Sequence, residues 1–139
     1  MTEIYFYSGA VDKCYTACRL SEKGVQQGLK VIVYTLDTAL IERIDKLLWT
    51  FSPTSFIPHS RVHDKLANVT PVILGHEIAK IKHHDVLLNL HDQYPPSFDR
   101  FNRLIEIASI KPEDKTAARK RYRFYQENGH KIYHYRLDN

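Results

Sequence analysis

The chain has 139 residues, of which 43% are hydrophobic and 26% are charged. This size and composition are typical of one globular domain, spanning residues 1–139, and not of a disordered protein. Two cysteines are too few for a disulfide-framed secreted fold. No apolar run is long enough to span a bilayer, and the amino terminus lacks the basic and apolar regions of a signal peptide. We therefore expect a cytoplasmic protein that no segment anchors in a membrane.

The net charge of +4 is concentrated near the carboxyl terminus. Residues 1–110 hold 12 Lys and Arg against 12 Asp and Glu, whereas residues 111–139 hold 8 against 4. Such asymmetry favours an acidic partner for this end of the chain, either a nucleic acid, an anionic membrane or an acidic peptide. A solvated basic helix without any partner is the alternative.

The first half of the chain alternates between strand and helix patterns. Residues 3–7 are aromatic and β-branched and predict a strand, which Ser8 and Gly9 end in a turn. Residues 10–27 repeat apolar side chains at helical spacing, and residues 31–34 predict a buried strand. A second helix, capped by Asp37 or Thr38, runs to Trp49.

The second half begins with an irregular, proline-containing connection over residues 52–71. Beyond it the patterns predict two buried strands, two helices and a last strand, over residues 72–74, 86–90, 98–108, 112–128 and 131–135. Pro112 and the acidic pair after it suit the start of the last helix.

The predicted order is β-α-β-α-β-β-α-α-β. Short apolar strands that alternate with amphipathic helices indicate a single three-layer α/β domain, with a mostly parallel sheet and helices on both faces. The topology is Rossmann-like, but residues 7–13 contain neither G-x-G-x-x-G nor a phosphate loop. A nucleotide site is therefore not expected.

The sequence contains no complete set of residues for a catalytic or metal site. Cys14 and Cys18 lie one helical turn apart, but without further ligands they suit buried thiols better than zinc. His76 and Glu77 begin an H-E-x-x-H pattern whose fifth position is Lys80. The sequence thus predicts a protein without catalytic residues, bound metal or cofactor.

A basic stripe on the last helix is the first candidate binding surface. Lys115, Arg119, Tyr122 and Arg123 follow the spacing of one helix face. Arginine binds carboxylates in a bidentate manner, and the tyrosine ring adds apolar contact, so the stripe suits a ligand that is both acidic and apolar. Tyr122 also falls on an aromatic stripe that would pack inward, which leaves a purely structural helix as the alternative.

Large apolar residues around the end of the second helix form the second candidate surface. They are Trp49, Phe51, Phe56, Ile57 and Pro58. They either fold over a sheet edge as a small additional core or form an exposed patch whose aromatic side chains anchor a partner.

Three blocks in order, IDKLLW at residues 44–49, SFIPH at 55–59 and ARKRY at 118–122, carry a family resemblance. Together they resemble the chi subunit of the bacterial DNA polymerase III holoenzyme. The resemblance implies a non-catalytic adaptor of the replisome at the nucleoid. Such an adaptor would join the clamp loader through the psi subunit and would bind the acidic C-terminal tail of single-stranded DNA-binding protein. It would contact DNA only indirectly, and no membrane.

Site residues follow from the resemblance position by position. It assigns Trp49 and Phe56, with their neighbours Ile57 and Pro58, to the side that binds psi. A helicase that competes with psi is a further candidate partner for this side. The resemblance assigns Arg119, Tyr122 and Arg123 to the side that binds the tail, and Lys115 one turn earlier. Ile110 is a candidate for an aliphatic contact there.

Direct binding of nucleic acid by the basic C-terminal helix is the main competing hypothesis. It predicts affinity for a bare oligonucleotide with a steep dependence on salt. The small charge excess and the nearby Glu113, Asp114 and Glu127 count against it.

Overall fold

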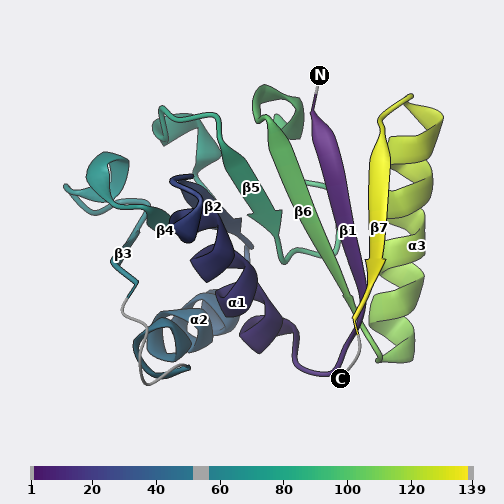
Figure 1. Ribbon diagram of the computed structural model, residues 1–139, viewed down its shortest axis with the longest axis horizontal. Coiled ribbons are helices and arrows are strands. Elements are labelled where there is room, and N and C mark those ends of the chain that lie inside the picture. Colours follow the sequence, from purple (N-terminus) through teal and green to yellow (C-terminus); the bar gives the residue numbers. More distant parts are fainter. Residues whose placement is uncertain (1, 52–56, 138–139) are drawn as a thin grey trace.

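A computed structural model describes residues 2–51 and 57–137. Within these residues, seven strands form one sheet in the order β3-β4-β2-β5-β6-β1-β7, and every neighbouring pair is parallel (Figure 1). The strands are β1 (Glu3–Ala10), β2 (Val31–Tyr34), β3 (His59–Arg61), β4 (Val72–Gly75), β5 (Val86–Asn89), β6 (Arg103–Ser109) and β7 (Ile132–Arg136). The α/β fold with a parallel sheet is as predicted.

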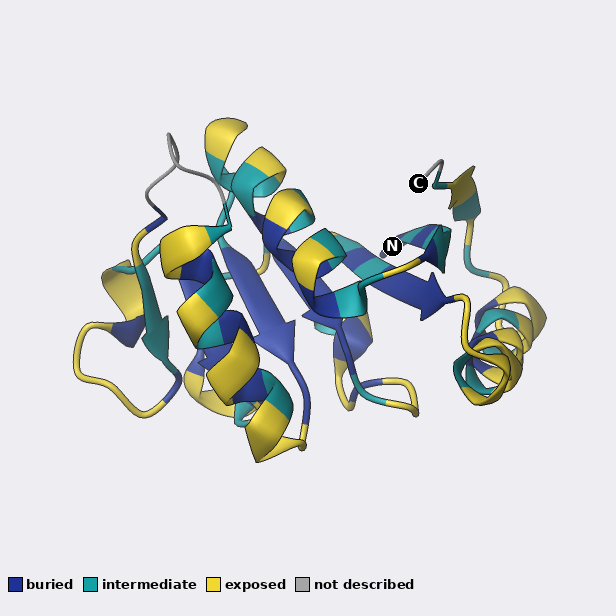
Figure 2. Cartoon of the chain, turned by 90° about the horizontal axis from the view of Figure 1, so that it is seen from below, coloured by how far each residue is buried: buried dark blue, intermediate teal, exposed yellow. Residues whose placement is uncertain are grey.

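Helices lie on both faces of the sheet. The α-helices are α1 (Lys13–Gln26), α2 (Thr38–Thr50) and α3 (Pro112–Glu127). Helices α1 and α2 pack side by side on one face, and α3 packs on the other face over β6 (Figures 1 and 2). Single 3-10 turns are η1 (Ala67–Val69), η2 (Ile78–Lys80) and η3 (Phe98–Arg100). None of the helices in residues 2–51 and 57–137 is long and apolar enough to cross a membrane.

Helices α1 and α2 each begin at an aspartate that caps them. The Asp12 carboxylate accepts a hydrogen bond from the backbone N–H of Tyr15, and Asp37 accepts bonds from Ala39 and Leu40. Short acidic side chains accept hydrogen bonds from the free N–H groups of the first helical turn, and their negative charge interacts favourably with the positive end of the helix dipole. Asp37, and not Thr38, is thus the cap of α2.

Alternate residues of each strand enter two separate cores. On β2, Val31 and Val33 pack towards α1 and α2, whereas Ile32 packs in the core on the α3 side. Cys14 and Cys18 are buried in the first of these cores, as the sequence predicts. Burial raises the pKa of Cys18 to about 12, which keeps this thiol protonated and chemically inert near neutral pH.

The predicted helix over residues 98–108 is wrong, because this segment forms η3 and then β6. Its apolar residues fit a helical spacing, but a strand that is buried on both faces has no polar alternation to identify it. Leu104 packs on the α3 side, and Ile107 packs on the opposite side. Pairing with β5 and β1 on either side decides the conformation.

Two further predictions differ from the structure. Ser8 and Gly9 do not end the first strand, because β1 continues through an irregularity in its register to Ala10. Gly9 adopts φ +81°, which glycine tolerates and which lets the strand bend there. The irregular connection over residues 52–71 contributes the short edge strand β3, which pairs with β4.

A buried ion pair holds α3 against β6. Glu106 on β6 is fully buried, and its carboxylate accepts hydrogen bonds from Arg121 (2.9 Å), Tyr125 (2.5 Å) and Asn89 (2.9 Å). Arg121 is itself 3% exposed and also donates to the backbone oxygen of Asp92 at 2.7 Å. Complete burial raises the pKa of the Glu106 carboxyl, and the Arg121 guanidinium opposes this shift.

Replacing Glu106 tests how much this pair contributes. Glu106→Gln leaves the Arg121 guanidinium buried without a counter-charge, so we expect the free energy of unfolding to fall by about 3–5 kcal/mol. Tyr125→Phe removes one hydrogen bond and keeps the ion pair, and it should cost only about 1 kcal/mol. Urea unfolding followed by circular dichroism measures both. Equal losses in the two variants would contradict the central role of the ion pair.

Candidate functional site

A cavity of about 450 Å³ lies where the carboxyl ends of β1, β6 and β7 meet the first half of α3. Parallel strands place their carboxyl ends at one edge of the sheet, so residues distant in sequence gather there. The cavity is lined by Phe6, Ser8, Gly9, Ala108, Ser109, Ile110, Lys115, Ala118, Arg119, Tyr122, His134 and Arg136. We call this the α3 cavity.

The α3 cavity is electropositive. Lys115 and Arg119 on α3 and Arg136 on β7 are exposed cations that line it. Within the described residues, none of these three cations makes an ion pair, and no lining residue carries a carboxylate. Their charges therefore remain available to an anionic ligand.

Aromatic packing fixes the position of Tyr122 in the cavity wall. Its ring lies edge-on to Phe6 at 5.2 Å and to His134 at 6.1 Å between centroids. His134 is held in turn by a 2.8 Å hydrogen bond between its Nε2 and the hydroxyl of Ser8. Tyr122 is half-buried, so it contributes to the core on one side and presents apolar surface to the cavity on the other.

Asp114 fixes the start of α3 beside the cavity. Its carboxylate accepts a 2.7 Å hydrogen bond from the Ser109 backbone N–H and a 3.0 Å bond from the Lys13 ammonium group. Burial alone would raise the pKa of Asp114, but these bonds outweigh it and hold the pKa below its ordinary value. The contact joins α3 to the end of β6 and to α1.

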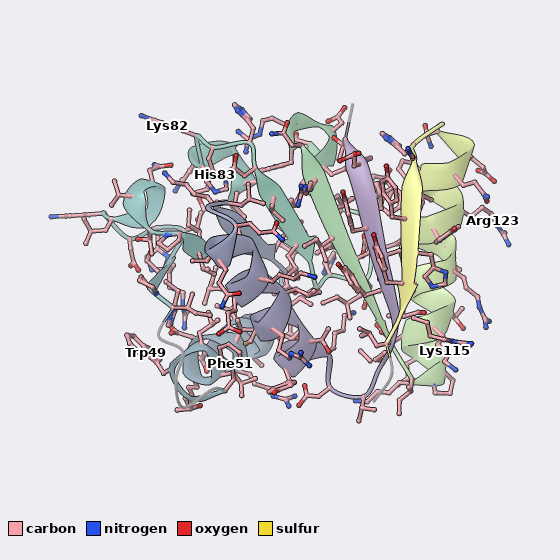
Figure 3. The ribbon with its side chains drawn as sticks, in the orientation of Figure 1. Trp49, Phe51, Lys82, His83, Lys115 and Arg123 are labelled. Carbon is pink, nitrogen blue, oxygen red and sulfur yellow. The ribbon has the colours of Figure 1, made fainter. Side chains whose placement is uncertain are left out.

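The structure brings together three of the four cationic or aromatic residues predicted on α3. Lys115, Arg119 and Tyr122 line the cavity, whereas Arg123 is exposed and points away from the sheet (Figure 3). Arg121, between them in sequence, faces the core. Ile110, the candidate for an aliphatic contact, is 50% exposed and lines the cavity.

Sequence reasoning missed the contributions of the strands to this cavity. Ser8, His134 and Arg136 come from β1 and β7, which are neighbours in the sheet although they lie at opposite ends of the chain. The only signal in the sequence was the expected parallel sheet, which gathers strand ends at one edge but leaves the strand order open.

The second candidate surface lies at the end of α2. Trp49 is 52% exposed there and, with the exposed Pro58, lines a shallow cavity of about 660 Å³ (Figure 3). Leu66, which sequence reasoning did not single out, lines the same cavity and is 68% exposed. We call these three residues the Trp49 patch.

The Trp49 ring packs on His59, which belongs to a polar cluster with Asp45 and Arg61. The His59 ring lies 4.8 Å from the Trp49 ring between centroids, and its Nε2 lies 2.7 Å from the Asp45 carboxylate. Arg61 donates two hydrogen bonds to the second Asp45 oxygen, at 3.0 and 2.9 Å. Burial alone would raise the pKa of Asp45, but these hydrogen bonds hold it below its ordinary value.

The other predicted residues near Trp49 have different locations. Ile57 is 2% exposed and packs in the core beneath α2, so a partner on this surface would meet Trp49 and Pro58 first. Phe51 is half-buried against the Tyr15 ring. Phe56 lies outside the described residues.

Residues that could hold a metal ion do not gather in the described ranges. No three His, Cys, Asp or Glu side chains there lie together in a suitable arrangement.

Comparison with known proteins assigns the family. Residues 1–133 match the family model described as "DNA polymerase III chi subunit, HolC". The chain belongs to the DNA polymerase III chi subunit family. A curated DNA polymerase III subunit chi from Pseudomonas aeruginosa is 34% identical over 99% of this chain and 98% of its own length. Membership of this family implies an accessory role in DNA replication.

Other relatives with the same description are more distant. The DNA polymerase III subunit chi of Haemophilus influenzae is 28% identical over 77% of this chain and 75% of its own length. The Escherichia coli protein is 23% identical over 81% of this chain and 77% of its own length. The family thus tolerates extensive sequence change over most of its length.

Neutralising Asp114 tests how firmly the start of α3 is held. The lowered pKa of Asp114 stabilises the fold fully above the unfolded-state pKa of about 3.9, and this contribution disappears as the pH falls through the folded-state pKa. Asp114→Asn should therefore lower the free energy of unfolding by about 1–2 kcal/mol at pH 7. The difference from the unmodified protein should shrink in acid, because that protein then protonates Asp114 as well.

Urea unfolding at several pH values measures this effect. Glu113→Gln, one residue earlier in the same helical turn, is the matched control and should cost only a few tenths of a kcal/mol. A cost for Asp114→Asn that does not change with pH would contradict the assigned ionic role.

Proposed function

We propose that this protein is a non-catalytic adaptor of the DNA polymerase III holoenzyme. On this proposal the α3 cavity binds the acidic C-terminal tail of single-stranded DNA-binding protein, and the Trp49 patch binds the psi subunit of the clamp loader. The observation that carries the proposal is the α3 cavity, whose unpaired cations surround an aromatic and aliphatic wall.

The chemistry of the cavity suits the end of such a tail. A disordered acidic tail that ends in an apolar residue offers side-chain carboxylates, a free α-carboxylate and one apolar side chain. Arg119 can bind a carboxylate through two parallel hydrogen bonds, and Lys115 and Arg136 add positive charge beside it. Tyr122 and Ile110 supply apolar contact for the terminal side chain.

Two physical costs set the expected strength of this interaction. Ordering a flexible tail consumes free energy, so the affinity should be on the order of micromolar. The cations are exposed, so salt should screen them and weaken binding. A modest, salt-sensitive affinity suits a contact that forms and breaks during replication.

The Trp49 patch offers a different kind of surface. A large aromatic side chain that is half exposed beside a proline and an exposed leucine is typical of an anchor for a protein partner. The His59–Asp45–Arg61 cluster holds the backbone and ring beneath Trp49, so the anchor is ordered before the partner binds.

The two surfaces are well separated. Trp49 lies in the last turn of α2 on one side of the molecule, and Lys115 lies on α3 on the other side (Figure 3). The sheet lies between the two helices. Both partners can therefore bind at once, which is what a bridging protein requires.

Substitution of Arg119 tests the tail site. We expect Arg119→Ala to weaken binding of a peptide with the tail sequence by about 1–3 kcal/mol, measured by calorimetry, because a charge-assisted hydrogen bond is lost. Lys120→Ala is the matched control, since Lys120 is an exposed cation next to Arg119 on the same helix but outside the cavity. It should have a clearly smaller effect. An unchanged affinity in Arg119→Ala would refute the site.

Substitution of Trp49 tests the psi surface. Trp49→Ala should abolish capture of psi in a pulldown while it spares binding of the tail peptide, because the anchor is lost and the α3 cavity is untouched. Leu36→Ala is the matched control, since Leu36 is an apolar residue of similar exposure, 53%, away from the patch. Retention of psi by Trp49→Ala would contradict the assignment of the Trp49 patch to psi.

A further inference from the structure

Four tyrosines form a cluster on the opposite face of β1 and β7 from the α3 cavity. Tyr5 and Tyr7 on β1 and Tyr133 and Tyr135 on β7 project to the side of the sheet that carries α1 and α2. Those helices lie over the other half of the sheet and leave β1 and β7 uncovered on this side (Figure 1). We call the four residues the tyrosine face.

The rings of the tyrosine face stack on one another across the two strands. The Tyr5 ring lies 5.1 Å from Tyr133, and the Tyr7 ring lies 5.2 Å from Tyr135 with an angle of 22° between the planes. Tyr135 is 45% exposed and belongs to the last strand of the sheet. The stack thus ends at a largely open aromatic ring at the sheet edge.

Cations surround this stack. The Arg103 guanidinium lies 5.4 Å from the centre of the Tyr5 ring, and the Lys131 ammonium lies 5.0 Å from the centre of the Tyr133 ring. Lys23 on α1 and Arg103 line a groove of about 220 Å³ together with Tyr5, Tyr7 and Tyr135. The carboxylate of Glu3 accepts long hydrogen bonds of 3.3 Å from Tyr5 and Tyr133.

We infer that the tyrosine face binds single-stranded nucleic acid. Aromatic rings beside lysine and arginine on an open sheet surface are what unpaired bases and their phosphates require, because bases stack on the rings and the cations neutralise the backbone. An apolar protein helix would gain little from cations placed among the rings, whereas a polyanion gains from every one.

The position of the tyrosine face keeps it independent of the α3 cavity. Successive side chains of a strand point to opposite faces, so β7 directs His134 and Arg136 into the cavity and Tyr133 and Tyr135 to the tyrosine face. A nucleic-acid strand on one face therefore leaves the other face open. The sequence hypothesis of nucleic-acid binding used α3, which lies on the wrong side for this contact.

Fluorescence anisotropy with labelled oligothymidylate and oligouridylate of about 15 nucleotides tests the inference. We expect the full-length protein to bind at least one of the two single strands, and duplex DNA more weakly, because its bases are already stacked. Tyr135→Ala should reduce the affinity at least about fivefold, whereas Tyr135→Phe, which keeps the ring, should retain it. Tyr94→Ala is the matched control, since Tyr94 is also 45% exposed but packs on Phe124 of α3.

Two measurements make the result decisive. Tyr135→Ala should keep the far-UV circular dichroism spectrum and the urea-unfolding midpoint of the unmodified protein, which demonstrates that it is folded. Lys131→Ala should make the salt dependence of oligonucleotide binding shallower by about 0.7 in slope for each lost phosphate contact. The inference is overturned if neither single strand binds, or if binding survives in Tyr135→Ala and is lost in Arg119→Ala.

Discussion

The ion pair between Glu106 and Arg121 determines how α3 sits on the sheet. α3 buries few side chains, Ala118, Arg121 and Tyr125, and two of these three contact Glu106 directly. Tyr122 and Phe124 pack, partly buried, against the same core, and Asp114 ties the first turn to Ser109 and Lys13, so the ion pair sets the rotation of the helix together with these contacts. Because Arg121 must face the fully buried carboxylate, Lys115, Arg119 and Tyr122 turn towards the ends of β1 and β7. The α3 cavity is a consequence of this constraint.

Parallel pairing accounts for the distribution of the surfaces. All strands end at the same edge, so the start of α3 and the ends of β1 and β7 enclose one cavity. The helices α1 and α2 cover only part of the opposite face, which leaves the tyrosine face open (Figure 2). The Trp49 patch lies at the far side, where α2 ends. A small fold of this kind separates three surfaces without any need for a second unit.

The errors of the sequence prediction have a common cause. The segment 98–108 was expected to be a helix because Phe98, Phe101, Leu104 and Ala108 fit a helical spacing, but the central strand β6 has neighbours on both sides and cores on both faces. Of the two interpretations left open for the apolar residues around Trp49, the structure places Ile57 in the core and Trp49 and Pro58 at the surface. In both cases long-range packing overrode a local pattern that permitted two interpretations.

Local chemistry in the sequence by itself determined the α/β class, the approximate bounds of α3, and the set of basic and aromatic residues on that helix. Those features depend on neighbours a few residues apart, which a sequence displays directly. Only the tertiary structure decided that β1 and β7 are adjacent, that Arg121 faces inward while Arg119 faces the cavity, and that Ser8, His134 and Arg136 join it. The pairing of β1 with β7 joins segments more than a hundred residues apart, and the rotation of α3 depends on contacts with β6, so no local pattern in one sequence encodes either.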